Sequence, residues 1–152
     1  MTRHLMVPVL LALLLAGVEQ AGAQRAGRGR GESPLGLTIY QHPTLQPDSV
    51  RLDIFTRISL DRLVFVAHEG GFLASYEMSV FAMDEDEMVL GTRIWQETVV
   101  RQAYKETQSE DEHHVAQTGM DLPLGTFSIV ANLWDKDTRQ RSTAREELEI
   151  EG

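Results

Sequence analysis

The segment GGFLASYEMSVFAMDEDEMVLG, residues 70–91, begins with two glycines, alternates between apolar and polar side chains and then reaches four consecutive acids. Side chains on a β-strand point alternately to two faces, so this alternation predicts a strand with one buried face. We expect the acids, residues 84–87, to form the solvated tip of a hairpin, and residues 88–100 to return as the next strand. Gly91 in the returning strand indicates a β-bulge or a close approach of the backbone. The residues predicted to share the buried face are Phe72, Ala74, Tyr76, Met78, Val80 and Ala82.

Similar alternation recurs along the chain between stretches of turn residues. Residues 49–58 alternate in this way, and so do residues 126–134, which follow a Pro-x-Gly turn. Residues 62–67 are apolar on both sides, so we expect a short central strand there, and we expect a weaker strand at residues 113–122. About seven short strands at such spacings predict an all-β fold, an immunoglobulin-like antiparallel β-sandwich.

Two further segments are less regular. Residues 104–112 are polar and predict a loop. Residues 141–152 contain Ala, Arg and Glu, which favour a helix, but Leu148 and Ile150 stand two apart between acids, which fits the period of a strand better. We therefore favour a final strand with Leu148 and Ile150 facing inward, and a helix remains the alternative.

The N-terminal residues have the features of a secretory signal peptide. Arg3 and His4 precede an apolar run, residues 5–18, and Ala21-Gly22-Ala23 supplies the small residues that signal peptidase reads. The sequence predicts a cleaved signal peptide at residues 1–23, a disordered or extended linker at residues 24–48 and the sandwich domain at residues 49–152; a retained N-terminal anchor is the alternative. We therefore expect export to the periplasm or the extracellular space, without stable membrane insertion after cleavage.

Composition and charge restrict the partners. The chain has no cysteine, so a lipid-anchored cysteine and disulfides are both excluded, and the core alone must hold the domain. From Pro34 onward there are 10 basic and 21 acidic residues, a formal charge of −11. Such a surface repels phosphate backbones and anionic lipids, which argues against nucleic-acid binding and membrane-surface binding.

Two acidic stretches are candidate metal sites. The acids Asp84 to Glu87 could offer carboxylate oxygens to Ca²⁺, but they lack the glycine of an EF-hand loop. In the stretch EDEHH, residues 110–114, His113 and His114 could hold Zn²⁺ with a nearby carboxylate. Adjacent residues on a strand point to opposite faces, however, so the two histidines are not expected to share one metal ion. We interpret both stretches as loops rather than sites.

Other kinds of site also lack a motif. No Gly-x-Ser-x-Gly turn is present for nucleophilic catalysis, and the glycines at 27, 29 and 31 precede the predicted fold rather than a helix. Trp95 and Trp134 could form a sugar platform, although we expect at least one of them to be buried in the sandwich. The sequence therefore nominates no catalytic, cofactor-binding or metal-binding residue, and no cofactor is predicted.

Between about Ser49 and Ser142, the order of features resembles the β-sandwich region of the GWxTD domain-containing proteins, an exported bacterial family. The matching pieces are LVFV (63–66), GGFLASYEMSV (70–80), Trp95, ETV (97–99), Thr107 with Ser109, and DLPLGTFSIVANLWD (121–135). Leu124 stands where that family often has a second proline, and no Gly-Trp-x-Thr-Asp motif occurs, so the activity of that motif is not carried over. The resemblance implies an extracytoplasmic β-sandwich without defined chemistry.

Taken together, these features predict a non-enzymatic secreted or periplasmic β-sandwich, an interaction or accessory module of the bacterial envelope with an envelope or secreted protein as its partner. The alternative is a carbohydrate- or cation-binding module. It would use either Trp134 with the Asp135-Lys136-Asp137 turn or the acids at residues 84–87.

Overall fold

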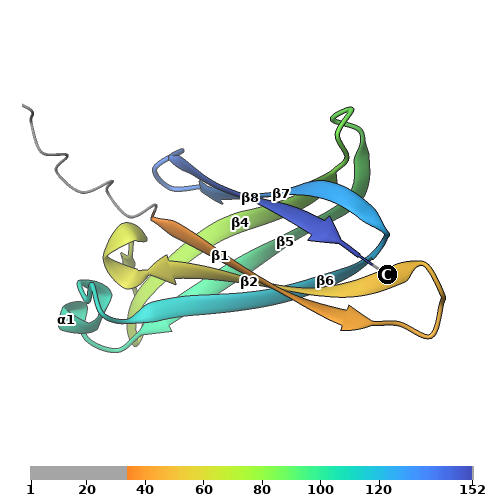
Figure 1. The fold of residues 1–152 in the computed structure, drawn as a ribbon. Coiled ribbons are helices and arrows are strands. Elements are labelled where there is room, and N and C mark those ends of the chain that lie inside the picture. Colours follow the sequence, from red (N-terminus) through yellow and green to blue (C-terminus); the bar gives the residue numbers. More distant parts are fainter. Residues whose placement is uncertain (1–33, 152) are drawn as a thin grey trace, which may run out of the picture. The chain divides into compact units, whose positions relative to one another are not determined.

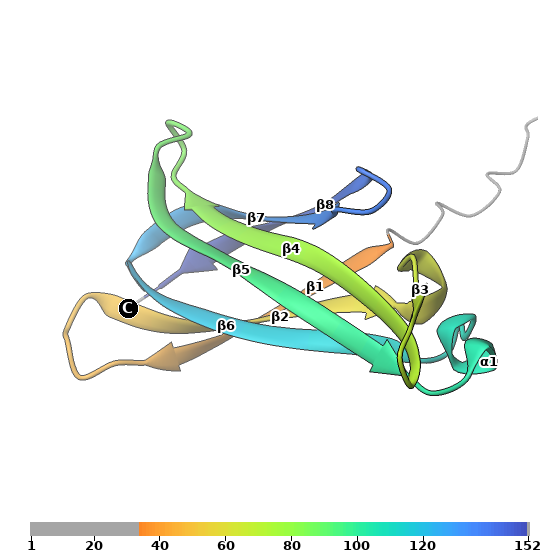
Figure 2. The same ribbon diagram turned by 180° about the vertical axis from the view of Figure 1, so that it is seen from behind.

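The computed structural model describes residues 34–151, which form two antiparallel β-sheets (Figures 1 and 2). The predicted all-β, immunoglobulin-like sandwich is thereby confirmed. This part of the chain contains eight strands, where about seven were expected. The elements are β1 (Leu35–Pro43), β2 (Ser49–Ser59), the 3-10 helix η1 (Leu60–Arg62), β3 (Val66–His68), β4 (Gly71–Met83), β5 (Val89–Arg101), α1 (Tyr104–Thr107), β6 (His113–Pro123), β7 (Gly125–Asp135) and β8 (Arg141–Ile150).

The two sheets form two layers. One sheet has the strand order β1-β2-β6, and the other has the order β5-β4-β7-β8, with β3 beside the first residues of β4. Several pairings join segments far apart in the sequence; Val50, for example, pairs with Leu122, and Tyr76 pairs with Asp135. Figure 2 shows that β5 and β6 lie at the neighbouring edges of the two sheets.

The core fills the space between the inner faces of the sheets. On β4, five alternate residues from Ala74 to Ala82 are buried, as the alternation predicts, whereas Phe72 is half-buried. Alternate residues of β2 from Leu52 to Ile58 face them from the other sheet, and those of β7 from Phe127 to Leu133 lie beside them in the same sheet. Burying a large apolar side chain contributes about 1.5–3 kcal/mol relative to leaving it exposed, so these three strands contain most of the stabilising area. The largest fully buried side chains are Tyr76, Leu35, Leu52, Ile54, Ile58, Leu60, Met78, Met120, Leu122, Ile129, Val80 and Thr56.

The predicted linker at residues 24–48 is wrong for its second half. Residues 35–43 form β1, which pairs along its whole length with β2, from Leu35 opposite Ile58 to Pro43 opposite Val50. Leu35 is buried in the core. The domain boundary expected at residue 49 therefore lies inside this sheet. The remainder of that linker, up to residue 33, and the predicted signal peptide lie outside the described residues.

The central strand expected at residues 62–67 is also wrong. Leu60 to Arg62 form η1, whose Leu60 side chain is buried and whose Leu60 N–H donates to the carbonyl of Glu112. Only the three residues of β3 pair with β4, and all three are exposed. The apolar character of this stretch therefore reflects a loop that buries Leu63 in the core, followed by a short peripheral strand.

The other assignments made from the sequence are largely confirmed. Residues 141–150 form β8 rather than a helix; Ile150 is buried and Leu148 packs against the core. The predicted loop after β5 contains one turn of helix, α1. The Glu106 carboxylate stabilises this turn because it accepts the N–H groups of Gln102 and Ala103.

The hairpin between β4 and β5 has the predicted tip (Figure 1) and, in its register, the predicted bulge. The register shifts by one residue between Ala82 and Met83, where Ala82 pairs with Gly91 and Met83 pairs with Val89. A β-carbon on Gly91 would lie 2.8 Å from the Met120 sulfur atom, so a close approach accompanies the bulge, although to a side chain rather than to the backbone.

Candidate functional site

The outer face of the five-stranded sheet has a groove of about 310 Å³, which we call the trough. The strand register defines its floor: Ser79 of β4 pairs with Asn132 of β7, which pairs with Thr143 of β8. One side of this polar row is bounded by Trp134, and the other side by Phe81. Trp134 pairs with Glu77 of β4, which lies four residues before Phe81. The two aromatic positions are therefore separated by roughly 13 Å along the strand direction. The lining residues are Glu77, Ser79, Phe81, Asn132, Leu133, Trp134 and Arg141.

The floor of the trough combines amide and hydroxyl groups. The Thr143 hydroxyl donates to Asn132 Oδ1 at 2.7 Å, and the Asn132 amide hydrogens have no acceptor among the described residues. Ser79 Oγ has no hydrogen-bond partner among the described residues. These groups can donate to and accept from a ligand's hydroxyl groups.

The rim of the trough carries charge beside an exposed aromatic ring. Trp134 is 36% exposed, and the Arg141 guanidinium lies 5.7 Å from the centre of its ring. This distance is within the range of a cation–π interaction, so the ring holds the guanidinium at the rim. Glu77 lies opposite, and Lys136 Nζ is 4.0 Å from its carboxylate. Among residues 34–151, Arg141 has no carboxylate partner.

The turn that follows Trp134 has a structural role. Asp135, which the sequence suggested as part of a binding turn, is buried. Its Oδ1 accepts the N–H groups of Asp137 and Thr138 at 2.9 and 3.0 Å, and its Oδ2 accepts from Val64 N–H at 3.4 Å. The structure therefore places Trp134 beside the trough residues rather than beside a free Asp135 carboxylate.

The second candidate surface is the free edge of β5, which we call the β5 edge. β5 pairs with β4 on one side, and no described strand pairs with it on the other. Ile94 and Val100 point outward from it and are 60% and 49% exposed. Met88, Val89 and Leu90 are exposed where the strand begins. The edge therefore combines backbone that pairs with no second strand and exposed apolar side chains, although the Arg93 side chain contacts Gly119 of β6.

The acids at residues 84–87 form the hairpin tip rather than a ligand cage. Asp84 Oδ1 accepts the N–H groups of Asp86 and Met88 at 3.0 and 2.9 Å, and Glu87 has a positive φ of 61°. The Asp84 carboxylate thus stabilises the turn. Among residues 34–151, no group of three His, Asp or Glu side chains is arranged to hold a metal ion.

The two histidines of the EDEHH stretch lie on opposite faces of β6. His113 is exposed, and its Nδ1 lies 3.0 Å from the Asp111 carbonyl. His114 is half-buried and faces inward, with its ring edge-on to Tyr76 at 5.9 Å between centroids. Its Nε2 is 3.9 Å from Glu97 Oε2, too far for a hydrogen bond. The structure therefore joins His114 to Tyr76 and Glu97, not to His113.

Burial controls the protonation of this inner cluster. Burial lowers the pKa of the His114 imidazole, while the nearby Glu97 carboxylate opposes that shift and Arg101 adds to it. Burial and then Glu97 raise the pKa of the Tyr76 hydroxyl. Within the described part of the chain, neither the Tyr76 hydroxyl nor His114 Nε2 has a hydrogen-bond partner. We interpret the cluster as packing between β4, β5 and β6.

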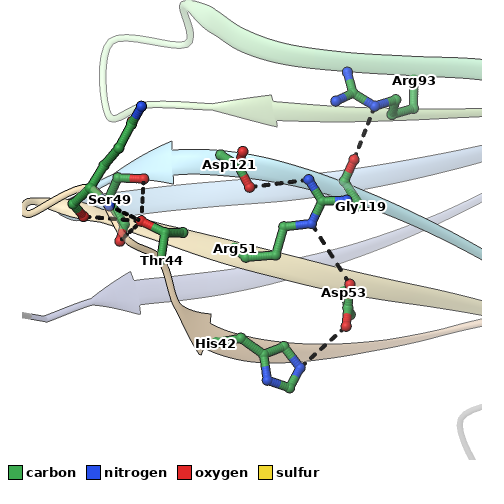
Figure 3. A network of polar contacts seen from close by, with 9 residues as sticks. His42, Thr44, Ser49, Arg51, Asp53, Arg93, Gly119 and Asp121 are labelled. Carbon is green, nitrogen blue, oxygen red and sulfur yellow. Dashed lines mark hydrogen bonds and ion pairs between the residues drawn. The ribbon is translucent and has the colours of Figure 1, made fainter.

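The outer face of the three-stranded sheet differs from the trough because its charges are paired (Figure 3). Arg51 lies 3.1 Å from Asp121 and 3.9 Å from Asp53, whose other oxygen lies 3.2 Å from His42 Nε2. Arg93 of β5 reaches the carbonyl of Gly119 at 3.0 Å, which joins the two sheets at their neighbouring edges. This face therefore offers fewer free groups to a ligand.

Sequence reasoning missed most of the trough. It named Trp134 as a candidate binding residue, but it did not nominate Phe81, Asn132 or Arg141 for a site. The alternation on each strand shows which residues point outward, whereas only the register between β4, β7 and β8 shows which of them are neighbours. At least one tryptophan was expected to be buried; Trp95 is partly buried and packs against the core.

Comparisons with known proteins support the fold. No family model matches the chain, and no curated protein matches it. Similar solved structures include β-glucuronidase 2 from Bacteroides uniformis (TM-score 0.54, 13% identity, 76% of this chain and 13% of that chain). A putative β-galactosidase from Bacteroides fragilis (0.54, 12%, 78% and 16%) and a glycosyl hydrolase family 2 member from Bacteroides cellulosilyticus (0.54, 11%, 77% and 15%) are also similar. The chain spans only 13–16% of the length of these three proteins, so the likeness is to one β-sandwich part of each.

Proposed function

We propose that the chain is an exported, non-catalytic β-sandwich that binds a protein partner as an accessory module of the bacterial envelope. The observation that carries this proposal is the β5 edge. A partner segment in extended conformation can add to such an edge through main-chain hydrogen bonds, while apolar side chains provide further contact.

The opposite edge of the same sheet supports the choice of β5. β8 carries Arg141, Arg145, Glu146, Glu147 and Glu149, and charged side chains on an edge strand oppose pairing with another chain. β5 carries three charged residues, Arg93, Glu97 and Arg101, on its inner face, whereas its outward positions from Thr92 to Val100 are uncharged: Thr92, Ile94, Gln96, Thr98 and Val100. Of the two edges, β5 is therefore the one suited to strand addition.

Export rests on two features of the sequence. Residues 1–23 have the pattern of a signal peptide, and residues 49–142 resemble the β-sandwich region of the exported GWxTD domain-containing proteins. Within residues 34–151, no helix has the length and apolar character needed to cross a membrane. An accessory role is further supported by the likeness to a small part of much larger enzymes.

The test uses the full chain as bait in a native envelope extract, followed by hydrogen exchange on the captured complex. We expect slowed exchange of amides in residues 89–101. Val100→Lys should weaken partner binding about tenfold or more, since a charge at the contact must lose solvent. Val115→Lys on β6 is the matched control, because Val115 is 53% exposed and Val100 is 49% exposed.

Two results would contradict the proposal. One is the absence of any specific partner from the extract, and the other is a partner whose binding changes equally in both variants. Protection confined to β1 or β6 would place the interface on the other sheet and exclude the β5 edge.

A second candidate function, saccharide binding, is favoured by a separate observation: Trp134 is exposed beside the polar floor of the trough. The likeness to β-sandwich parts of a β-glucuronidase and a putative β-galactosidase agrees with a protein that works near carbohydrate. Titration of the full chain with a panel of oligosaccharides tests it, with Trp134→Ala as the variant. Cation binding, the other part of this alternative, loses support because Asp84 is engaged in its own turn.

A further inference from the structure

We infer that the trough binds a saccharide bearing a carboxylate, that is, a uronic-acid unit, with Arg141 as the group that recognises the charge. This inference rests on the second candidate function, saccharide binding, and specifies its ligand class.

The first step concerns Arg141. Its guanidinium is held 5.7 Å from the centre of the Trp134 ring and has no carboxylate partner among the described residues. A guanidinium stacked on an aromatic ring keeps its N–H donors available at its edge, and its planar fork matches a carboxylate with two parallel hydrogen bonds. Arg145, four residues further along β8, contrasts with it: its Nε is 2.8 Å from the Glu147 carboxylate. Arg141 is therefore the available cation on this face of β8.

The second step concerns the rest of the trough. Trp134 and Phe81 offer apolar ring surface, on which the apolar face of a pyranose can pack. Between them, Ser79 and Asn132 offer a hydroxyl and an amide at the positions of the floor, which suit the hydroxyl groups of a sugar ring. A ligand that satisfies the whole trough thus needs an apolar ring face, several hydroxyl groups and one negative charge near Arg141. A uronic acid has all three.

The third step concerns the net charge, which opposes an anionic ligand. The described domain is strongly acidic, but charges further away than about 8 Å are largely screened at physiological ionic strength. Near the trough, the Glu77 carboxylate has Lys136 at 4.0 Å as its counter-ion, so it is compensated locally. The unpaired charge at the rim is then that of Arg141, and the local preference is for an anion.

The experiment compares uronate oligomers with their neutral methyl esters, which keep the ring, the linkage and the hydroxyl groups. Oligogalacturonate, oligoglucuronate and alginate oligomers are titrated into the full chain by calorimetry, each beside its methyl ester. We expect at least one acid form to bind about tenfold or more tightly than its ester, because a charge-assisted hydrogen bond is stronger than a neutral one. Arg141→Gln should remove this difference, whereas Arg145→Gln, the matched control on the same face, should retain it.

The outcomes separate the inference from the function on which it rests. Equal binding of acid and ester, with both lost in Trp134→Ala, overturns the carboxylate specificity but retains saccharide binding. No binding of any acid or neutral oligomer overturns both. Tyr40→Ala, which removes an exposed aromatic side chain from the other sheet, checks that any loss in Trp134→Ala is specific to the trough. Thermal unfolding of each variant establishes that it is folded, and loss of acid preference in Arg145→Gln as well would exclude Arg141 as the recognising group.

Discussion

Along β4, successive side chains enter two different environments. Ala74, Tyr76 and Met78 point inward and are at most 1% exposed, whereas Ser75, Glu77 and Ser79 point outward and are half-buried. The inward residues meet apolar partners from the other sheet, so their contribution is to stability. The outward residues meet β5 and β7 in the same sheet and line part of the trough. One strand thus holds the core with one face and a candidate binding site with the other.

The test with the largest expected effect compares substitutions of two neighbouring residues of β4 that point to opposite faces. Met78→Ala should lower the free energy of unfolding by about 2–5 kcal/mol, because it removes a fully buried side chain opposite Trp95 and Leu133 and leaves a cavity. Ser79→Ala, one residue away on the outer face, should change it by no more than about 0.5 kcal/mol. Urea unfolding measures both. Similar values for the two variants would contradict the division into two faces.

A second test acts where β4 begins, since both faces depend on its register. Gly71 has a φ of +151°, and a β-carbon there would lie 2.2 Å from the Arg101 carbonyl oxygen. Gly71→Ala should therefore lower the free energy of unfolding by about 2–3 kcal/mol, because it strains the backbone and displaces β5. Gly70→Ala is the control for a positive φ without a clash, because no atom lies within 4 Å of its β-carbon position. If the two variants lose the same free energy of unfolding, the backbone conformation, rather than the contact with Arg101, causes the loss.

The third test has the smallest expected effect and concerns the inner cluster at Tyr76. The pKa of His114 is lowered from its usual value of 6.5 by burial, so the unfolded chain takes up this proton at a higher pH than the folded chain does. The free energy of unfolding should therefore fall as the pH drops from about 7.5 to 5.5. His114→Gln should flatten this dependence, whereas His113→Gln on the exposed face should not. Parallel pH profiles for wild type and His114→Gln would exclude His114 as the cause.

Several elements could be predicted because the patterns that indicate them lie within short stretches of the sequence. The alternation on β4, β7 and β8 identified their buried faces, and the run of acids identified a hairpin tip. Residues 35–43 were missed because β1 has only a few buried residues and depends on pairing with β2 for its place. Residues 62–67 were misassigned because a loop that buries Leu63 and then enters a short exposed strand has the same apolar composition as a central strand.

The sequence by itself determined the all-β class, the inward and outward faces of the longer strands, and the acidic character of the surface. These properties follow from side-chain alternation and composition, which need no knowledge of the neighbours. The tertiary structure alone decided which outward residues lie together. Pairing of β4 with β7 and of β7 with β8 placed Ser79 beside Asn132 and Thr143, and it placed Trp134 between Glu77 and Arg141. Strand register is set by the packing of two whole sheets, so the trough emerges only when the chain is folded.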